Sequence, residues 1–524
     1  MSNKDYKLDT TRNLYSAPVY KSDKNGWTDD YLKLVQSENE LSIDVTAITS
    51  FLSVGQFSKN RTLFNEIKRL PWLAEPLPDG DYNELKLPKH GFKTGSDDQL
   101  ATLLFEKLCQ EAREVIKHHQ KIYILLTGGL DSRIIAGVYS YLYANGEIKE
   151  KPKCVTWGLE DSRDVYYAKL MASHLGFEWE HIPLGPETVM ENIRKCGKYL
   201  SMLHSPEMLH SMLWFQNLPS DAMVIAGSFG DSMGRGEFSS LHLLQLERKV
   251  PKNTYDLLVP EVYKVGSNRL KDDLDYIHNR GGDATLKYMQ CEYWMQGYRM
   301  RNGLCHALSV INRFANIYQM FTAPVVYEFI WSLHPSRRDD HIYTALLKNH
   351  FPKLAEVPWA RNNKAIKGSY KDKKLRAHYH DYTKWSSGEL YDDIKALVDP
   401  DWFANTGLFN KESISQMNGL VLKSKERVGR LNDIWLWLAG FRYYIDALHN
   451  EGKIINFGSI GNSLETVSPS ATKMGVKGQA VLLASKSNLV NHTAKKVREK
   501  YRNMDLNTKK KQMIKKYPPE PYEN

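Results

Sequence analysis

The stretch KIYILLTGGLDSRIIAGVYSYLYANG, residues 121–146, decides the fold. It begins with a short apolar run over residues 121–126, which is typical of a buried strand in a parallel sheet. The glycine-rich turn TGGLDS follows at residues 127–132. Residues 133–144 have the pattern of a helix, and Asn145-Gly146 is a good signal for its end. The stretch therefore predicts a strand, a turn and a helix, which together start a βαβ unit.

The turn TGGLDS carries groups that suit a polyphosphate. Its two glycines let the backbone approach a phosphate closely, and the N–H groups at the start of the next helix point toward the anion. Thr127 and Ser132 add hydroxyl donors. Asp131 makes chemical sense beside phosphates mainly as a ligand of Mg²⁺. The turn is neither a Walker loop nor the dinucleotide motif GxGxxG, and a purely geometric role of the two glycines is the alternative interpretation.

The neighbouring segments continue the alternation of strand and helix. We expect further strands at residues 153–157 and 222–226, and helices at residues 97–118 and 163–175. Beyond about residue 280 the pattern is mainly helical. The clearest apolar stripe there consists of Ile434, Leu438, Phe441, Ile445 and Leu448. These patterns predict an α/β fold, a parallel sheet flanked by helices, with a mainly helical C-terminal part.

The composition is that of an ordinary globular protein. The chain has 524 residues, of which 42% are hydrophobic and 25% charged, so we expect two or three domains. No run approaches the roughly 18 to 20 apolar residues of a membrane span, and the start lacks an apolar signal stretch. We therefore expect a cytoplasmic protein without a membrane span. The five cysteines are widely spaced and include no CxxC pair, which argues against a disulfide framework and a zinc site.

The positive charge is concentrated near the C-terminus. The net charge is +10, and residues 486–516 hold eleven Lys or Arg against Glu499 and Asp505. A solvated terminal helix is one interpretation of this basic tail. Contact with an anionic partner is the other.

Three stretches resemble one known family in the same order along the chain. LLTGGLDSRIIAG (125–137) resembles the pyrophosphate-loop signature SGGxDS of N-type ATP pyrophosphatases and, more narrowly, the synthetase domain of asparagine synthetases. CVTWGLEDSRDVYYAKLMASHLGFEWEHIPL (154–184) is similar to the family's second strand, adenine-side loop and following helix. VIAGSFGDSMGRG (224–236) is similar to its second glycine-rich loop, roughly SGEGxDExFGG. FTAPVVYEFIWSLHP (321–335) and FPKLAEVPWARNNK (351–364) are weaker matches.

The resemblance implies a domain organisation. Residues 97–450 would form the ATP pyrophosphatase domain, with an adenine nucleotide alpha hydrolase-like (HUP-type) sheet. Residues 1–96 would be an irregular segment, interpreted as a remnant of a glutaminase domain. Residues 451–524 would be the basic tail.

The resemblance also implies the roles of individual residues. The ATP phosphates would lie on the first loop, at Leu126, Thr127, Gly128, Gly129, Asp131 and Ser132. Mg²⁺ would be held by Asp131 and Asp231, beside Gly230 of the second loop. The adenine would be bordered by Thr156, Trp157 and Gly158. The lysine that stabilises the transition state matches Lys364 best, with Lys367 as the fallback.

The sequence departs from the family pattern at three places. Ser2 stands where glutamine-dependent members have their catalytic cysteine, and the chain before residue 121 is too short for a full glutaminase, so we expect none. The glutamate that would assist the incoming amine falls on Ser228, and the glutamate after Asp231 falls on Ser232. Arg235 in the same loop could contact phosphate or be an exposed cation.

We expect an ATP-dependent, AMP-forming ligase that adenylates a small-molecule carboxylate and passes it to ammonia or an amine. Asp131, Asp231 and Lys364 would carry the catalysis, with ATP and Mg²⁺ as cofactors. Relatives without the glutaminase modify surface-polysaccharide sugars or cyclise peptides, so the carboxylate need not be aspartate. The alternative is a catalytically idle, nucleotide-binding homologue that acts as an assembly or regulatory subunit. A thiolating or tRNA-modifying enzyme is a third hypothesis, which the lack of a CxxC pair disfavours.

Overall fold

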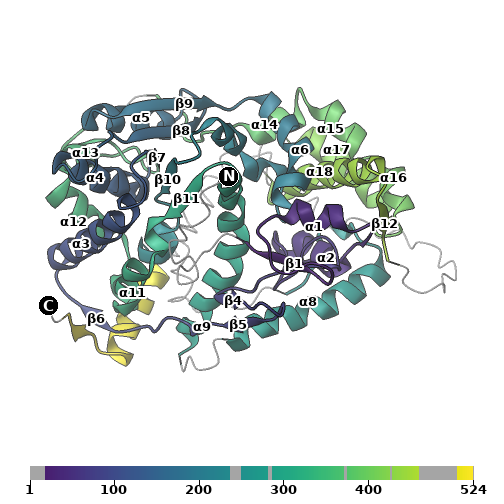
Figure 1. Cartoon of the computed structure of the whole chain (residues 1–524), viewed down its shortest axis with the longest axis horizontal. Coiled ribbons are helices and arrows are strands. Elements are labelled where there is room, and N and C mark those ends of the chain that lie inside the picture. The colour runs from purple at the N-terminus through teal and green to yellow at the C-terminus, as the bar shows by residue number, and fades with distance from the viewer. Residues whose placement is uncertain are drawn as a thin grey trace.

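The centre of the fold is a five-stranded parallel sheet in the order β11–β10–β7–β8–β9. The computed structural model describes residues 18–235, 250–280, 286–370, 374–424, 428–458 and 504–522. The strands are β7 (Ile122–Leu125), β8 (Lys153–Gly158), β9 (Glu178–Pro183), β10 (Met223–Ala226) and β11 (Asn316–Gln319). Figure 1 shows the sheet in one half of the molecule, surrounded by helices.

The helices around the sheet confirm the α/β fold that the sequence predicts. They include α3 (Asp97–Ile116), α4 (Leu130–Ala144), α5 (Arg163–Leu175) and α12 (Asp340–His350). The helix after β9, α6 (Pro186–Leu200), packs instead on α18 (Leu431–Asn450) in the other half of the molecule (Figure 1). The chain enters the sheet at β7, continues outward through β8 and β9, and then returns to place β10 on the other side of β7. The strand order therefore reverses between β7 and β10. In open α/β sheets, such a switch point opens a crevice at the carboxyl ends of the strands, where ligands bind.

Local signals explain where α5 begins and ends. The Ser162 side chain accepts a hydrogen bond from the backbone N–H of Val165, at 3.3 Å, which satisfies one of the free donors of the first turn. Gly176 ends the helix with a φ of +66°, a conformation that glycine adopts without strain. The helix therefore has the bounds that the sequence predicts.

The two edge strands, β9 and β11, were not among the strands expected from the sequence. Side chains of β9 alternate between exposed and partly buried positions until Ile182, so the strand lacks the continuous apolar run of a central strand. β11 has only four residues, and Asn316 is exposed. Both strands have a neighbour on one side only, and their sequences are correspondingly polar.

The N-terminal segment is built of short elements that pack into the main core. They are β1 (Tyr20–Ser22), α1 (Tyr31–Ser37), β2 (Glu40–Ser42), α2 (Val45–Val54), β3 (Ile67–Arg69), β4 (Ala74–Pro76), β5 (Tyr82–Glu84) and β6 (Lys93–Thr94). The apolar helix α2 is buried along almost its whole length and packs against α8 (Pro260–Arg280). The expectation of an irregular segment is therefore wrong for residues 18–96. The division of the chain into domains stays a prediction.

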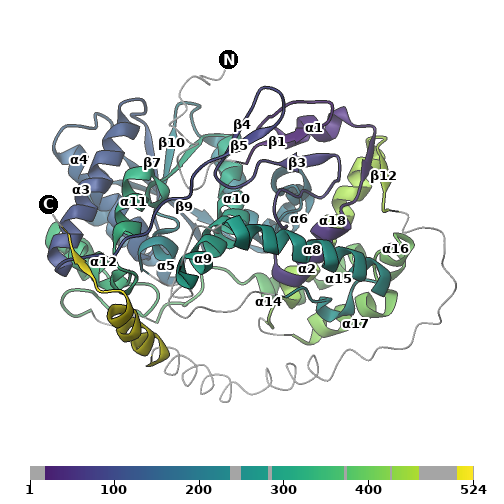
Figure 2. The same ribbon diagram turned by 90° about the horizontal axis from the view of Figure 1, so that it is seen from below.

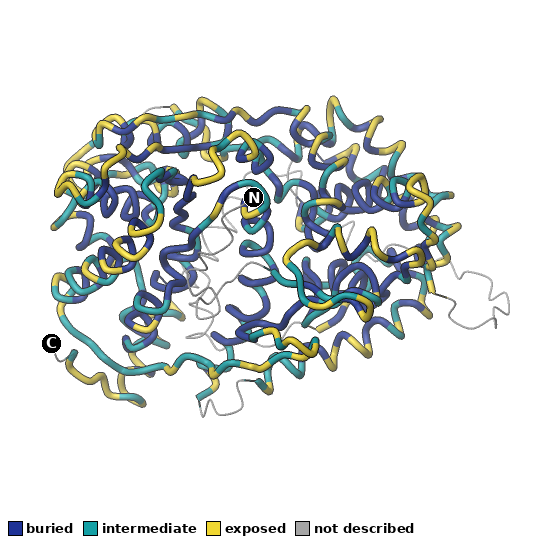
Figure 3. The backbone as a smooth tube through the Cα atoms, in the orientation of Figure 1, coloured by how far each residue is buried: buried dark blue, intermediate teal, exposed yellow. Residues whose placement is uncertain are grey.

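Beyond residue 280 the described chain is mainly helical, as expected. The helices there, besides α12, are α9 (Lys287–Trp294), α10 (His306–Leu308), α11 (Pro324–Ser332), α13 (Pro352–Glu356), α14 (Tyr382–Ser387), α15 (Tyr391–Leu397), α16 (Pro400–Asn405), α17 (Lys411–Lys423) and α18 (Leu431–Asn450). In Figure 1, α11 and α13 lie in the sheet half, whereas α14 to α18 lie in the other half. All five residues of the predicted stripe in α18 are buried. Figure 3 shows buried backbone running through both halves, and one continuous apolar core joins them.

The end of the described chain returns to the sheet half, as Figure 2 shows. β12 (Ile454–Asn456) pairs with β2, and β13 (Glu520–Pro521) pairs with β6. Between them, residues 504–516 form a helix whose Met513 is buried and whose Lys510 lies 2.8 Å from the Asp339 carboxylate. The basic run at residues 486–503 lies outside the described residues. Within the described ranges, none of the helices has the length and apolar character needed to cross a membrane.

Candidate functional site

The first glycine-rich loop connects β7 to α4 at the switch point of the sheet. The hydroxyl oxygen of Ser132 accepts a hydrogen bond from the Thr127 backbone N–H, at 3.1 Å, and the Thr127 hydroxyl accepts one from the Gly129 N–H, at 3.2 Å. These bonds close the turn. No side chain caps the start of α4 at Gly129, so the N–H groups of the first helical turn are directed toward any anion bound there.

Gly128 lies in close contact with a segment from much later in the chain. A Cβ atom on Gly128 would lie 2.6 Å from the Cβ of Ala360, and the Gly128 carbonyl accepts a hydrogen bond from the Ala360 N–H, at 3.0 Å. The buried Arg133 guanidinium holds the same segment, because it donates to the carbonyls of Leu354, Val357 and Pro358. Burial lowers the pKa of Arg133 to about 9.

The segment that contacts Gly128 continues to Lys364. The Lys364 carbonyl accepts a hydrogen bond from the Trp359 N–H, at 2.9 Å, which closes a short turn over residues 359–364. The Lys364 side chain is exposed. Its role in catalysis stays a prediction, as does that of Lys367, which is also exposed.

The second loop, at residues 227–235, packs directly on the first. A Cβ atom on Gly230 would lie 2.7 Å from the Asp131 Cγ, and one on Gly227 would lie 2.6 Å from the Ser132 backbone nitrogen. Only glycine fits at these positions without movement of the first loop. Asp231 follows at the start of a π-helical turn, Asp231–Arg235, and its Oδ1 accepts a hydrogen bond from the Ser232 N–H, at 2.7 Å.

The two serines of this loop are placed differently. Ser232 is fully buried, and its hydroxyl donates to the Phe229 carbonyl, at 3.1 Å. Ser228 is partly exposed. Asp231 is the one acidic residue in the sequence from Gly227 to Arg235, so neither serine position supplies the carboxylate base of the family pattern.

Arg235 is neither an exposed cation nor directed at solvent. Its side chain is 5% exposed, and its Nε and Nη2 donate to the two carboxylate oxygens of Asp131, at 2.8 and 3.1 Å. Its Nη1 donates to Asp340, at 3.0 Å. The expectation of an exposed loop cation is therefore wrong, and Asp340, at the start of α12, is a member of the site that sequence reasoning missed.

Carboxylates from three elements surround this guanidinium. Besides Asp131 and Asp340, Asp231 lies near enough to raise the pKa of Arg235 electrostatically. Oxygen donors of this type suit Mg²⁺, so Asp131 and Asp231 fit the chemistry of the expected ion. In the part of the chain that the structure describes, however, no group of three or more His, Cys, Asp or Glu side chains is arranged to hold a metal.

The carboxyl end of β8 lies next to the first loop. The Thr156 hydroxyl donates to the Leu126 carbonyl, at 2.7 Å, and Thr156 is buried, so this side chain joins the ends of β7 and β8. Trp157 stacks on His210 with ring centroids 5.9 Å apart. Gly158 has a φ of +142°, which favours glycine. Contact of Thr156, Trp157 and Gly158 with adenine stays a prediction.

Two titratable residues near this edge have shifted pKa values. Burial, reinforced by His380, lowers the pKa of His210 to about 3, so His210 is neutral at physiological pH. Burial raises the pKa of Asp164, in the first turn of α5, to about 6, and a hydrogen bond to the Gly128 backbone partly opposes this shift.

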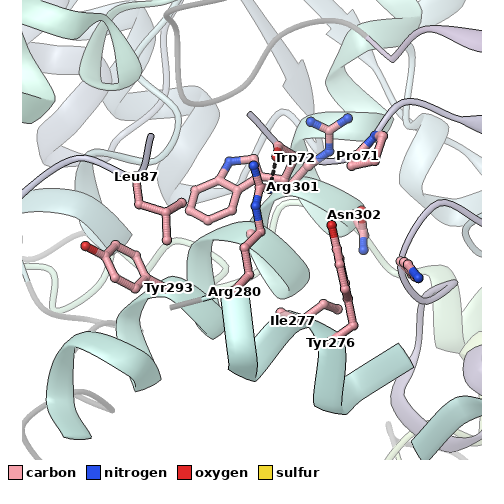
Figure 4. Close-up of a pocket in the computed structure, with 11 residues that line it drawn as sticks. Pro71, Trp72, Leu87, Tyr276, Ile277, Arg280, Tyr293, Arg301 and Asn302 are labelled. Atoms are coloured by element: carbon pink, nitrogen blue, oxygen red, sulfur yellow. Dashed lines mark hydrogen bonds between the residues drawn. The ribbon is translucent and has the colours of Figure 1, made fainter. Parts of the chain in front are cut away.

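One cavity lies away from these loops. Figure 4 shows it between the N-terminal segment and α8, lined by Trp72, Tyr276, Arg280, Tyr293 and Arg301 among others. None of the site residues that the sequence predicted lines it.

Comparison with known proteins relates part of the chain to one family. Residues 106–275 match the family model described as asparagine synthase. Over 93 residues the chain is 30% identical to an asparagine synthetase (glutamine-hydrolyzing) from Gallus gallus. This stretch covers 18% of the chain and 16% of the chicken protein. The family match includes both glycine-rich loops with Asp131 and Asp231, and it ends before Lys364.

Proposed function

Because this chain contains an asparagine synthase-like synthetase domain at residues 106–275, we propose that it is an ATP-dependent, AMP-forming ligase. The observation that carries the proposal is the direct packing of the two glycine-rich loops at the switch point, where Gly230 leaves room for the Asp131 carboxylate. A phosphate-binding helix start and two carboxylates from neighbouring strands suit a reaction in which pyrophosphate leaves.

In the first half-reaction, a carboxylate oxygen of the substrate attacks the α-phosphorus of ATP, and the bond to the pyrophosphate breaks. The loop Thr127–Ser132 binds the phosphates through backbone N–H groups, Thr127 and Ser132. Asp131 and Asp231 would hold Mg²⁺, which neutralises the charge of the leaving pyrophosphate. Lys364 follows the segment that is hydrogen-bonded to Gly128 through Ala360. It is the proposed cation that stabilises the transition state.

In the second half-reaction, the nitrogen of ammonia or an amine attacks the acyl carbon, and AMP leaves. The nitrogen must lose a proton in this step. With serines at positions 228 and 232, the second loop offers no glutamate for that proton. The proposal therefore includes an acceptor outside this loop, such as an AMP phosphate oxygen.

The serine substitutions favour one alternative function. A chain that binds ATP without completing the amide bond would act as an assembly or regulatory subunit. The two functions agree on the nucleotide site and differ in whether a carboxylate is activated.

Thermal unfolding with Mg²⁺ and ATP tests the nucleotide site. Ligand at about 100 times its dissociation constant stabilises the folded chain by about 2.7 kcal/mol. We expect the wild type to be stabilised and Asp131→Ala to show no shift. Asp221→Ala is the matched control. Asp221 precedes β10 at the amino end of the strand, away from the two loops at the carboxyl ends, and its side chain is 61% exposed. Absence of a shift in the wild type would refute the nucleotide site.

Pyrophosphate exchange then separates the two functions. The enzyme should incorporate labelled pyrophosphate into ATP when a suitable carboxylate is present. We would screen aspartate, sugar acids and peptides with free carboxylates. Stabilisation by Mg²⁺ and ATP together with no exchange on any member of the panel would favour the regulatory subunit.

A further inference from the structure

Arg235 pairs with the Asp131 carboxylate, which the sequence analysis assigns to Mg²⁺. Both oxygens of the Asp131 carboxylate accept hydrogen bonds from the Arg235 guanidinium, at 2.8 and 3.1 Å. A parallel, two-point pair of this kind is the strongest arrangement between arginine and a carboxylate. The Arg235 guanidinium therefore neutralises the Asp131 carboxylate.

The surroundings of Arg235 hold its guanidinium in this place. Asp340 accepts the third hydrogen bond, at 3.0 Å. The guanidinium also lies 5.3 Å from the ring centroid of Trp359 and 5.8 Å from that of Tyr343, on aromatic faces that attract cations. Its side chain is 5% exposed and that of Asp131 is 15% exposed, so water screens the pair weakly.

A free Mg²⁺ ion competes poorly with such a pair. Mg²⁺ gives up its water reluctantly and is usually bound through one or two carboxylates plus the phosphates of a substrate. To bind Asp131 alone, the ion would have to displace the guanidinium from its two-point pair and leave this buried cation with its hydrogen bond to Asp340 in place of three hydrogen bonds to carboxylates, which is unfavourable. A nucleotide changes this balance, because its phosphate oxygens can accept the hydrogen bonds that Arg235 loses.

We propose that Arg235 is a resident cation that blocks metal binding at Asp131 until a polyphosphate arrives. The inference rests on the proposed nucleotide site and adds its regulation: nucleotide phosphate and divalent metal bind together, and neither binds well alone. Asp340 keeps its hydrogen bond to Arg235 while Asp131 binds the metal. It therefore holds the guanidinium close to Asp131, so that the two can pair again when the metal leaves. By linkage, metal and nucleotide raise each other's affinity by the same factor.

The test measures divalent metal without nucleotide. Mn²⁺ serves as the probe, and the loss of the free-ion signal in electron paramagnetic resonance reports binding to the full chain. We expect weak binding in the wild type. In Arg235→Gln the affinity of the strongest site should rise at least about tenfold, equivalent to about 1.4 kcal/mol. The double variant Arg235→Gln with Asp131→Asn should lose the gain, which places the new site at Asp131.

Two further variants separate this effect from net charge and from misfolding. Arg361→Gln removes the same charge from a residue 5.4 Å from the same Trp359 ring, and it should leave Mn²⁺ binding at the wild-type level. Arg235→Lys keeps the charge but cannot form the two-point pair, so it should give a smaller gain even if the glutamine variant folds poorly. Equal Mn²⁺ affinity in wild type, Arg235→Gln and Arg235→Lys would overturn the proposal, as would an equal gain in Arg361→Gln.

Addition of ATP distinguishes this proposal from the proposed function. In the wild type, ATP should increase the affinity for Mn²⁺ sharply, and in Arg235→Gln it should increase it less. If the wild type binds no ATP with or without metal, the proposed function fails. In that case a Mn²⁺ site gained in Arg235→Gln would still show that Arg235 blocks Asp131.

Discussion

Replacing Asp164 by asparagine should stabilise the protein at neutral pH but not at acidic pH. Asp164 lies in the first turn of α5, and its Cα would lie 3.3 Å from a Cβ atom on Gly128 of the first loop. Burial raises the pKa of its carboxyl group from 3.8 to about 6. The folded protein therefore favours the protonated, neutral carboxyl group, and ionisation of Asp164 lowers the stability of the folded state at pH 7.

The sign of the effect follows from proton linkage. Between pH 4 and 6, the folded state binds more protons at Asp164 than the unfolded state, because its pKa is the higher of the two. Protonation of Asp164 therefore adds to the free energy of unfolding. This contribution is fully present below about pH 4 and is lost as the pH rises through about 6. A shift from 3.8 to about 6 corresponds to about 3 kcal/mol, and we expect about 1 to 3 kcal/mol because the side chain is not completely shielded from water.

Urea denaturation of wild type and Asp164→Asn at pH 4 and at pH 7.5 measures this effect. Asparagine has the same shape, carries no charge and can still accept a hydrogen bond from the Gly128 backbone. The stability difference between variant and wild type should grow by about 1 to 3 kcal/mol from the lower to the higher pH. Asp161→Asn is the control, because Asp161 is exposed and lies just before the same helix. A difference independent of pH, or one that falls as the pH rises, would refute the reasoning.

Two other predictions concern the second loop and the C-terminal segment. Gly230→Ala should weaken binding of Mg²⁺ and ATP at least about tenfold, or 1.4 kcal/mol, in calorimetry, because the new Cβ would lie 2.7 Å from the Asp131 Cγ. Gly419→Ala, with open space around the new atom in α17, should bind normally, and equal affinities would contradict the packing argument. Met513→Ala should cost about 2 kcal/mol of side-chain packing and speed proteolytic cleavage within residues 504–522. An unchanged cleavage rate would show that Met513 does not hold this segment.

The sequence predicts the parts of the fold that local patterns encode. The strand before Thr127 and the helix after Ser162 have an apolar run, a turn and a cap within a few residues of each other, and both appear as expected. β9 and β11 were missed because an edge strand has one solvated side and so lacks that apolar run. The bounds and packing of the short elements in residues 18–96 were not predicted, because their burial depends on α8 and other distant helices, which no local pattern reveals.

The sequence likewise predicts some residues of the candidate site but not the long-range contacts between them. Asp131 and Asp231 were chosen from their own loops, and the packing of Gly230 against Asp131 joins those loops in space. The pairing of Arg235 with Asp131 spans 104 residues, and Asp340 lies a further 105 residues from Arg235. Neither contact has a local signal, because the residues that form it lie in segments far apart in the sequence.

The strand order has a consequence for synthesis on the ribosome. Asp131 is translated 104 residues before Arg235, an interval of about 5 to 20 s at the usual rate of about 5 to 20 residues per second. During this time β7, β8 and β9 can already pair as neighbours, whereas the inner position beside β7 waits for β10. The nascent chain therefore carries the Asp131 carboxylate without its guanidinium partner until β10 inserts, and the nucleotide site is among the last parts of the sheet to be completed.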